Sequence, residues 1–188
     1  MAGQRSSHTD STTTGTLVIL RLFPNLTVAH ETRITNGEGG LPAGALVANG
    51  GFGQACATSI RDVDGDGLND IAVGALTSSI TNTNDGALYI LFMRGDDTVR
   101  NFTRLSQAVG EGFDRLPVAV SFLGDSIAAL PPRDPGNNPV DIVVSAIGSN
   151  TVALAPLGSN GTLSAAPRRF WTDTGRLPIG TFNGRFGR

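Results

Sequence analysis

The sequence predicts an all-β fold, and more specifically a partial β-propeller of about two and a half four-stranded antiparallel blades. Three observations favour this fold class. The 188 residues include 25 glycines and 10 prolines, which are turn formers. Apolar residues occur in short runs of strand length, and few windows have a helical period. The chain also repeats itself at a fixed interval, which is typical of architectures built from stacked units.

The repeat has a period of 71 residues. Gly15-Thr-Leu-Val-Ile-Leu20 returns as Gly86-Ala-Leu-Tyr-Ile-Leu91, and Asp70-Ile-Ala-Val-Gly-Ala75 returns as Asp141-Ile-Val-Val-Ser-Ala146. The identical positions are mainly glycines and apolar strand residues, which a fold constrains most strongly. A third copy begins near Thr151. Several short strands in each unit match one propeller blade.

The repeat divides the chain into four segments. Residues 1–14 are a polar leader or the remnant of a preceding blade, and 15–85 are a blade with an acidic loop. Residues 86–150 are a degenerate blade and 151–188 an incomplete third blade. We expect strands at Leu17–Leu20, Ala55–Ile60, Ile71–Ala75, Leu88–Phe92, Val118–Leu123 and Ile142–Ala146. These units cannot close a ring of about 4 to 8 blades, so we expect the remaining blades in a longer chain.

Composition excludes several classes of partner and site. The net charge is −2 and the arginines are scattered along the chain, which argues against a nucleic-acid partner. Cys56 is the only cysteine, so a disulfide within the chain and a thiolate metal site are excluded. No apolar run approaches the roughly 18 residues that span a bilayer, and no signal peptide is visible.

One segment has the residue types of a metal-binding site, the acidic loop Asp62-Val-Asp-Gly-Asp-Gly-Leu-Asn-Asp70. Its four carboxylates repel one another unless a cation neutralises them. Oxygen ligands without His or Cys favour a hard ion, Ca²⁺ before Mg²⁺. Gly65 and Gly67 allow the chain to turn tightly around that ion. The expected ligands of one Ca²⁺ are four side chains and one backbone carbonyl: Asp62, Asp64, Asp66, Asp70 and Leu68.

An EF-hand loop is the alternative interpretation of this segment. It requires a glutamate at its twelfth position and helices on both sides. The twelfth position here is Val73, and the flanks Ala57–Ile60 and Ile71–Val73 are typical of β-strands. We therefore expect the acidic loop to be the turn of a β-hairpin.

Four segments in this order and spacing resemble the FG-GAP repeat. They are Gly51-Phe52-Gly53, the acidic loop, Ile71-Ala-Val-Gly-Ala75 and Gly86-Ala-Leu-Tyr-Ile-Leu91. That family forms the β-propeller heads of integrin α subunits and related surface proteins. The resemblance implies a calcium-binding hairpin on one face of the propeller and ligand binding on the opposite face. Leu76 departs from the family pattern, which has proline there.

The second unit has a weaker version of the acidic loop. At the repeat offset only Asp141 remains a carboxylate, and the other positions hold Arg133, Pro135 and Asn137. A slip of one residue would bring in Asp134. So few negative charges beside an arginine predict a structural turn that does not bind calcium.

Two other motifs are set aside. Phe122-Leu-Gly-Asp-Ser-Ile127 resembles the nucleophile block of GDSL-type esterases, with Ser126 as the nucleophile. Those enzymes take their histidine base from further along the chain, but His8 and His30 both precede the serine, so we expect no enzyme activity. Arg94-Gly95-Asp96 is the tripeptide that integrins recognise, and we interpret it as ordinary turn residues.

The functional expectation combines the metal loop with signs of an extracellular setting. Asn25, Asn101 and Asn160 each begin an N-glycosylation sequon. We expect a calcium-binding module that mediates protein binding or cell adhesion at the cell surface or outside the cell, through a protein ligand or partner subunit. The alternative is a non-catalytic propeller domain attached to an extracellular hydrolase or lyase.

Overall fold

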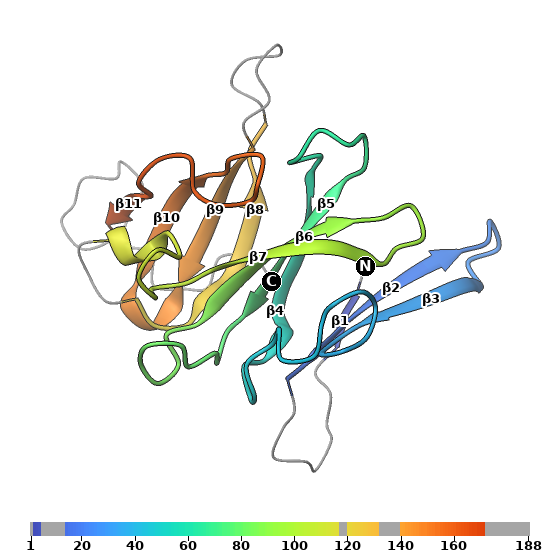
Figure 1. Ribbon diagram of the computed structural model, residues 1–188, viewed down its shortest axis with the longest axis horizontal. Coiled ribbons are helices and arrows are strands. Elements are labelled where there is room, and N and C mark those ends of the chain that lie inside the picture. The colour runs from blue at the N-terminus through green and yellow to red at the C-terminus, as the bar shows by residue number, and fades with distance from the viewer. Residues whose placement is uncertain (1, 5–13, 117–119, 132–139, 172–188) are drawn as a thin grey trace.

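The computed structural model describes residues 2–4, 14–116, 120–131 and 140–171. Within them the protein is all-β, with eleven strands in three antiparallel sheets and two short 3-10 helices (Figure 1). The predicted all-β class is confirmed. The described part of the chain contains no helix with the length and hydrophobicity that a membrane span requires.

The three sheets follow one another along the chain, and sheet II lies between the other two in Figure 1. Sheet I consists of β1 (Ala2–Gln4), β2 (Thr16–Leu22) and β3 (Val28–Ile34). Sheet II consists of β4 (Phe52–Arg61), β5 (Asp70–Ala75), β6 (Ala87–Met93) and β7 (Val99–Leu105). Sheet III consists of β8 (Leu123–Ala129), β9 (Asp141–Ala146), β10 (Thr151–Pro156) and β11 (Arg168–Trp171). The 3-10 helices are η1 (Phe113–Arg115) and η2 (Ile147–Ser149).

The 71-residue repeat is visible in the strands themselves. Strands β2 and β6, β3 and β7, and β5 and β9 begin and end at equivalent positions of the repeat. The register is repeated too, because Leu17 pairs with Ile34 as Leu88 pairs with Leu105. Equivalent sequences therefore form equivalent hairpins.

The boundaries of the predicted units fall inside the observed sheets and not between them. The predicted boundary between residues 85 and 86 falls between β5 and β6 of sheet II, and the one between 150 and 151 falls between β9 and β10 of sheet III. Comparing a sequence with itself reveals a period, but it does not show which strands pair. Residues 5–13 of the predicted leader and 172–188 of the predicted third blade lie outside the described residues.

The strand expected at Val118–Leu123 begins in residues 117–119, which lie outside the described part of the chain. Over residues 120–122 the expectation is wrong, because β8 begins at Leu123. Phe122 has a φ of 57°, and its N–H donates a hydrogen bond to the Asn84 carbonyl at 2.8 Å. Phe122 therefore belongs to the turn that leads into β8.

Two hydrophobic clusters hold the sheets together. One lies between sheets I and II and includes Leu17, Ile34, Tyr89 and Val99. The other lies between sheets II and III, and its largest fully buried members are Ile60, Leu88, Ile90, Leu105, Phe113, Leu123 and Ile142. Strand β6 is buried along its whole length because it contributes alternate side chains to the two clusters.

A repeated backbone link joins consecutive sheets. The Phe52 N–H donates to the Thr14 carbonyl at 2.9 Å, and the Leu123 N–H donates to the Asp85 carbonyl at 3.0 Å. Each link is followed by a parallel bridge, Gly15 to Phe52 and Gly86 to Leu123. A Cβ on Gly86 would lie 2.3 Å from the Leu123 nitrogen, so only glycine allows this approach.

Candidate metal centre

The acidic loop connects β4 to β5 at one end of sheet II. Arg61 is the last residue of β4 and Asp70 the first of β5, so the loop is the turn of a β-hairpin, as predicted. Strands on both sides contradict the EF-hand alternative. The β6–β7 turn lies at the same end of the sheet, because the Met93 N–H donates to Asp70 Oδ1 at 3.1 Å.

Asp62 organises the tip of the loop. Its Oδ1 accepts hydrogen bonds from the N–H groups of Gly65 at 2.7 Å and Asp66 at 3.1 Å, and its Oδ2 accepts one from Gly67 at 2.8 Å. Gly65 and Gly67 have φ values of 83° and 89°, which residues with a side chain rarely adopt. The two glycines therefore allow the chain to close around one carboxylate.

Asp70 is the buried carboxylate of the loop. Its Oδ2 accepts a hydrogen bond from the Val63 N–H at 2.9 Å, and the residue is 0% exposed. Burial raises the pKa of Asp70, the hydrogen bonds from Val63 and Met93 lower it in part, and the charges of Asp64 and Asp66 raise it further. The net pKa of Asp70 is raised because the effect of burial exceeds that of the two hydrogen bonds.

Three of the predicted ligands converge. Asp62, Asp64 and Asp70 each offer a carboxylate oxygen, and these three oxygens lie within 4.8 Å of one another. Calcium–oxygen distances of 2.3–2.6 Å place any two ligands of one ion no more than about 5 Å apart. The three carboxylates are therefore close enough together to be oxygen ligands of one metal ion such as Ca²⁺.

The other two predicted ligands, Asp66 and Leu68, are not part of this group of three. The Asp66 carboxylate is outside the group of three, and its Oδ1 accepts a hydrogen bond from the Leu68 N–H at 2.9 Å. Its Oδ2 lies 3.0 Å from Nη2 of Arg100. Leu68 is 38% exposed. The roles of the Asp66 side chain and the Leu68 carbonyl as ligands stay predictions.

Arg100 of β7 is the charged neighbour that the sequence reasoning missed. Its Nη2 contacts Oδ2 of Asp64 as well as Oδ2 of Asp66. Arg100 is 36 residues from Asp64 in sequence, and its repeat equivalent is Ala29. Only the pairing of β6 with β7 brings it to the loop.

The second acidic loop lies mostly outside the described residues. Arg133, Asp134, Pro135 and Asn137 fall in the segment 132–139. Asp141 is 5% exposed at the start of β9, as Asp70 is buried at the start of β5.

The strands before this loop support the one-residue slip considered from the sequence. Ser59 pairs with Ile71, and the repeat offset would pair Leu130 with Ile142. Ala129 pairs with Ile142 instead, so the register of β8 is shifted by one residue from the repeat. The absence of calcium binding by the second loop stays a prediction.

The Arg-Gly-Asp tripeptide lies in the β6–β7 turn, and both of its charged side chains have contacts within the turn. Asp96 Oδ1 accepts hydrogen bonds from the Thr98 N–H at 3.0 Å and the Thr98 hydroxyl at 2.6 Å. Arg94 Nη1 donates to the Val99 carbonyl at 2.5 Å. These contacts support the interpretation of the tripeptide as turn residues.

Two of the three sequons form the same kind of turn. Asn25 Oδ1 accepts hydrogen bonds from the Thr27 N–H at 3.1 Å and hydroxyl at 2.7 Å. Asn160 Oδ1 accepts the equivalent bonds from Thr162 at 3.1 and 2.7 Å. Asn101 lies in β7 and is exposed. A turn-forming role therefore accounts for the Asn-X-Thr pattern at Asn25 and Asn160.

The residues of the esterase alternative lie in different sheets. Ser126 belongs to β8 of sheet III, and its N–H donates to the Ser145 hydroxyl at 2.9 Å. His30 belongs to β3 of sheet I, and His8 lies outside the described residues. The structure therefore gives the esterase alternative no support from His30.

Comparison with known families identifies the segment that contains the candidate metal centre. The family model described as FG-GAP repeat matches residues 57–91. This range runs from β4 through the acidic loop and β5 into β6. A search of curated proteins found no match to the chain.

Proposed function

From the FG-GAP repeat at residues 57–91, we propose that the protein is a calcium-binding β-propeller module. The observation that carries this proposal is the convergence of Asp62, Asp64 and Asp70 within 4.8 Å, inside the matched segment. These three carboxylates hold the ion, with the Leu68 carbonyl and Asp66 as further ligands. The bound Ca²⁺ supplies the positive charge that compensates the buried Asp70 and fixes the hairpin.

The proposal that the three sheets are propeller blades rests on their connection. The same backbone link leads from sheet I to sheet II and from sheet II to sheet III. Each link is accompanied by a hydrophobic cluster between the two sheets. A repeated relation between successive sheets is the defining property of radial repeat architectures.

The proposed role is protein binding or cell adhesion at the cell surface or outside the cell. FG-GAP domains are protein-interaction modules, and the family occurs in surface proteins. Calcium affinities of about 10⁻⁴ to 10⁻³ M suit extracellular modules, where the ion is abundant. The protein acts without catalysis, so an esterase assay should detect no hydrolysis that Ser126→Ala abolishes.

Titration calorimetry tests the metal site. We expect one Ca²⁺ per chain with a Kd of about 10⁻⁴ to 10⁻³ M, and at least tenfold weaker binding for Asp64→Asn. Glu31→Gln is the matched control, because Glu31 is an exposed carboxylate on β3 of sheet I. Equal calcium binding by wild type and Asp64→Asn would contradict the site. A second calcium per chain would contradict the prediction for residues 132–139.

A further inference from the structure

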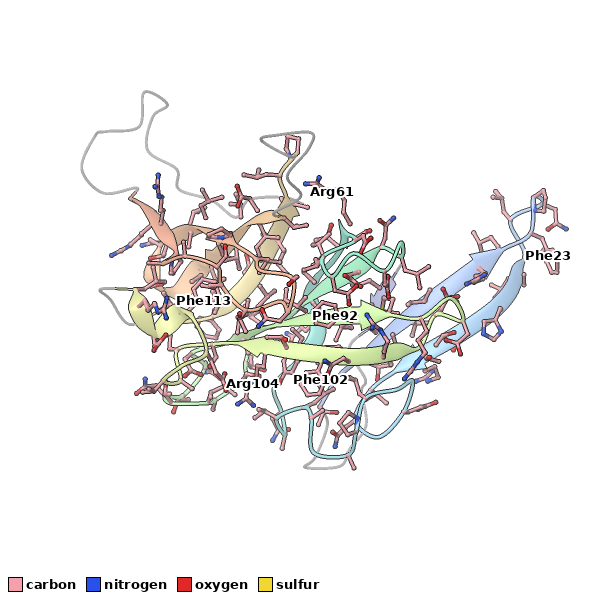
Figure 2. All side chains as sticks on the ribbon, turned by 45° about the horizontal axis from the view of Figure 1, so that its top comes forward. Phe23, Arg61, Phe92, Phe102, Arg104 and Phe113 are labelled. Carbon is pink, nitrogen blue, oxygen red and sulfur yellow. The ribbon has the colours of Figure 1, made fainter. Side chains whose placement is uncertain are left out.

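Arg100 reaches the acidic loop from a β-bulge. In the pairing of β6 with β7, Phe92 lies opposite Asn101 and Met93 lies opposite Val99, so Arg100 is the extra residue. A bulge redirects the side chain of its extra residue away from the regular alternation of the strand. Phe92, labelled in Figure 2, marks this position in the middle of the molecule.

The bulge itself is a property of the repeat, but its arginine is not. In sheet I, Arg21 lies opposite His30 and Leu22 lies opposite Val28, which leaves Ala29 as the extra residue. Ala29 and Arg100 are equivalent positions. The backbone of the bulge therefore forms without a long cationic side chain. The strand geometry alone does not explain why an arginine occupies this position in sheet II.

Arg100 contacts two carboxylates of the loop with one nitrogen. Nη2 is 3.0 Å from Asp66 Oδ2 and also contacts Asp64 Oδ2, and the Asp64 side chain is 19% exposed. Asp64 belongs to the group of three that converges for a metal. Arg61 of β4 and Arg94 of the β6–β7 turn donate to backbone carbonyls instead, Arg61 to Leu130 and Arg94 to Val99.

We propose that Arg100 is an internal cation that competes with the metal ion for Asp64 and thereby sets the calcium affinity of the loop. A guanidinium is always protonated in proteins, so this competition does not depend on pH in the physiological range. Without a metal, Arg100 offsets part of the repulsion among the carboxylates. With Ca²⁺ bound, its charge repels the ion or its side chain moves away. This proposal rests on the proposed calcium site.

The test is Arg100→Gln, measured by calcium calorimetry and by thermal unfolding in EDTA. Repulsion between a single and a double charge about 6 Å apart in water corresponds to roughly tenfold in affinity, so we expect Ca²⁺ to bind about tenfold more tightly. In EDTA the same variant should unfold about 1–3 °C lower, because the loop has lost its counter-charge. Opposite signs in the two measurements distinguish competition from general damage.

Three variants complete the design. Arg33→Gln is the control, because Arg33 is a half-exposed arginine on β3 that pairs only at 3.5 Å with Glu31. Arg100→Ala repeats the test with alanine, the residue at the same bulge position in sheet I, and replaces Arg100→Gln if that variant folds poorly. Arg100→Lys keeps the charge and should bind calcium within about threefold of wild type.

The outcomes separate this proposal from the calcium site itself. If wild type binds calcium and Arg100→Gln binds it equally or more weakly, the competition is refuted and the site stands. If only Arg100→Gln and Arg100→Ala bind calcium, Arg100 competes so strongly that the proposed function of the wild type fails. If no variant binds calcium, both proposals fail.

Discussion

Sheets I and II contain equivalent hairpins that differ in how far they are buried. Their hairpins β2–β3 and β6–β7 share strand bounds, register and a bulge at the same position. Val99 is 0% exposed, whereas its equivalent Val28 is 53% exposed, and Met93 and Leu22 differ in the same way at 5% and 52%. The apolar pattern determines the hairpin, and the neighbouring sheet determines whether one face of it is buried.

The hairpin tips show the same contrast. Leu26 and Asp97 occupy equivalent turn positions, each with a φ of 66°. Leu26 is 79% exposed in the projecting tip next to Phe23, which Figure 2 labels. Asp97 instead accepts a hydrogen bond from Arg21 Nη2 of sheet I at 2.9 Å. Because the turn conformation is the same, the difference at this position comes from the residue type and from the neighbouring sheet, which supplies Arg21 for Asp97.

The largest effect is expected from the glycines that link the sheets. Gly86→Ala and Gly15→Ala should each reduce the free energy of unfolding by about 3–5 kcal/mol, because both have positive φ and a Cβ would overlap the next sheet. Urea unfolding measures this. Gly95→Ala is the control, since its Cβ would meet nothing within 4 Å. A small effect at Gly15 alone would show that the two links are not equivalent.

The two equivalent valines test the difference in burial directly. Val99→Ala should cost about 2–3 kcal/mol of unfolding free energy, and Val28→Ala less than about 1 kcal/mol. Both replacements remove the same atoms from equivalent strand positions, so any loss of strand propensity cancels in the comparison. Equal losses in chemical denaturation would mean that Val28 is covered in solution.

A buried carboxylate distinguishes the second link from the first. Asp85 is equivalent to Thr14, and its carboxylate accepts hydrogen bonds from the Ile80 N–H at 2.9 Å and the Thr81 N–H at 2.8 Å. Burial raises the pKa of Asp85, but hydrogen bonds from Thr81, Ile80 and Asn82 outweigh this, and the net pKa is lowered.

A lowered pKa in the folded state means that stabilisation is present above the unfolded pKa of about 3.9 and is lost as the pH falls through the lower folded value. Asp85→Asn should therefore cost about 2 kcal/mol at pH 7 and progressively less below about pH 4. Unfolding curves across this range test the sign. A constant difference between variant and wild type would contradict it.

The smallest effect is expected for the ion pair between the sheets. Arg21 and Asp97 lie at the surface, where solvent and salt screen the attraction. A double-mutant cycle with Arg21→Gln and Asp97→Asn should show weak coupling at low salt. The coupling should vanish at about 1 M NaCl, where the Debye length is about 3 Å. Coupling that persists at that concentration would indicate a contact other than charge.

The sequence by itself determined the local elements of this protein. The alternation of apolar residues and the recurring Gly, Thr and Val positions predicted the repeat and the hairpin that carries Asp62 and Asp70. They also predicted five of the eleven described strands: β2, β4, β5, β6 and β9. These features depend on residues that are close in the chain, because strand periodicity, turn chemistry and charge spacing act over a few residues.

Only the tertiary structure decided which of these elements meet. The pairing of the strands determines where one sheet ends and the next begins along the repeat. The burial of Val99 depends on a neighbouring sheet that Val28 lacks on its equivalent face. Arg100 reaches Asp64 because a bulge redirects its side chain and because two hairpin turns lie at the same end of sheet II. Such contacts join residues far apart in the chain, so they follow from packing and pairing and not from any local pattern.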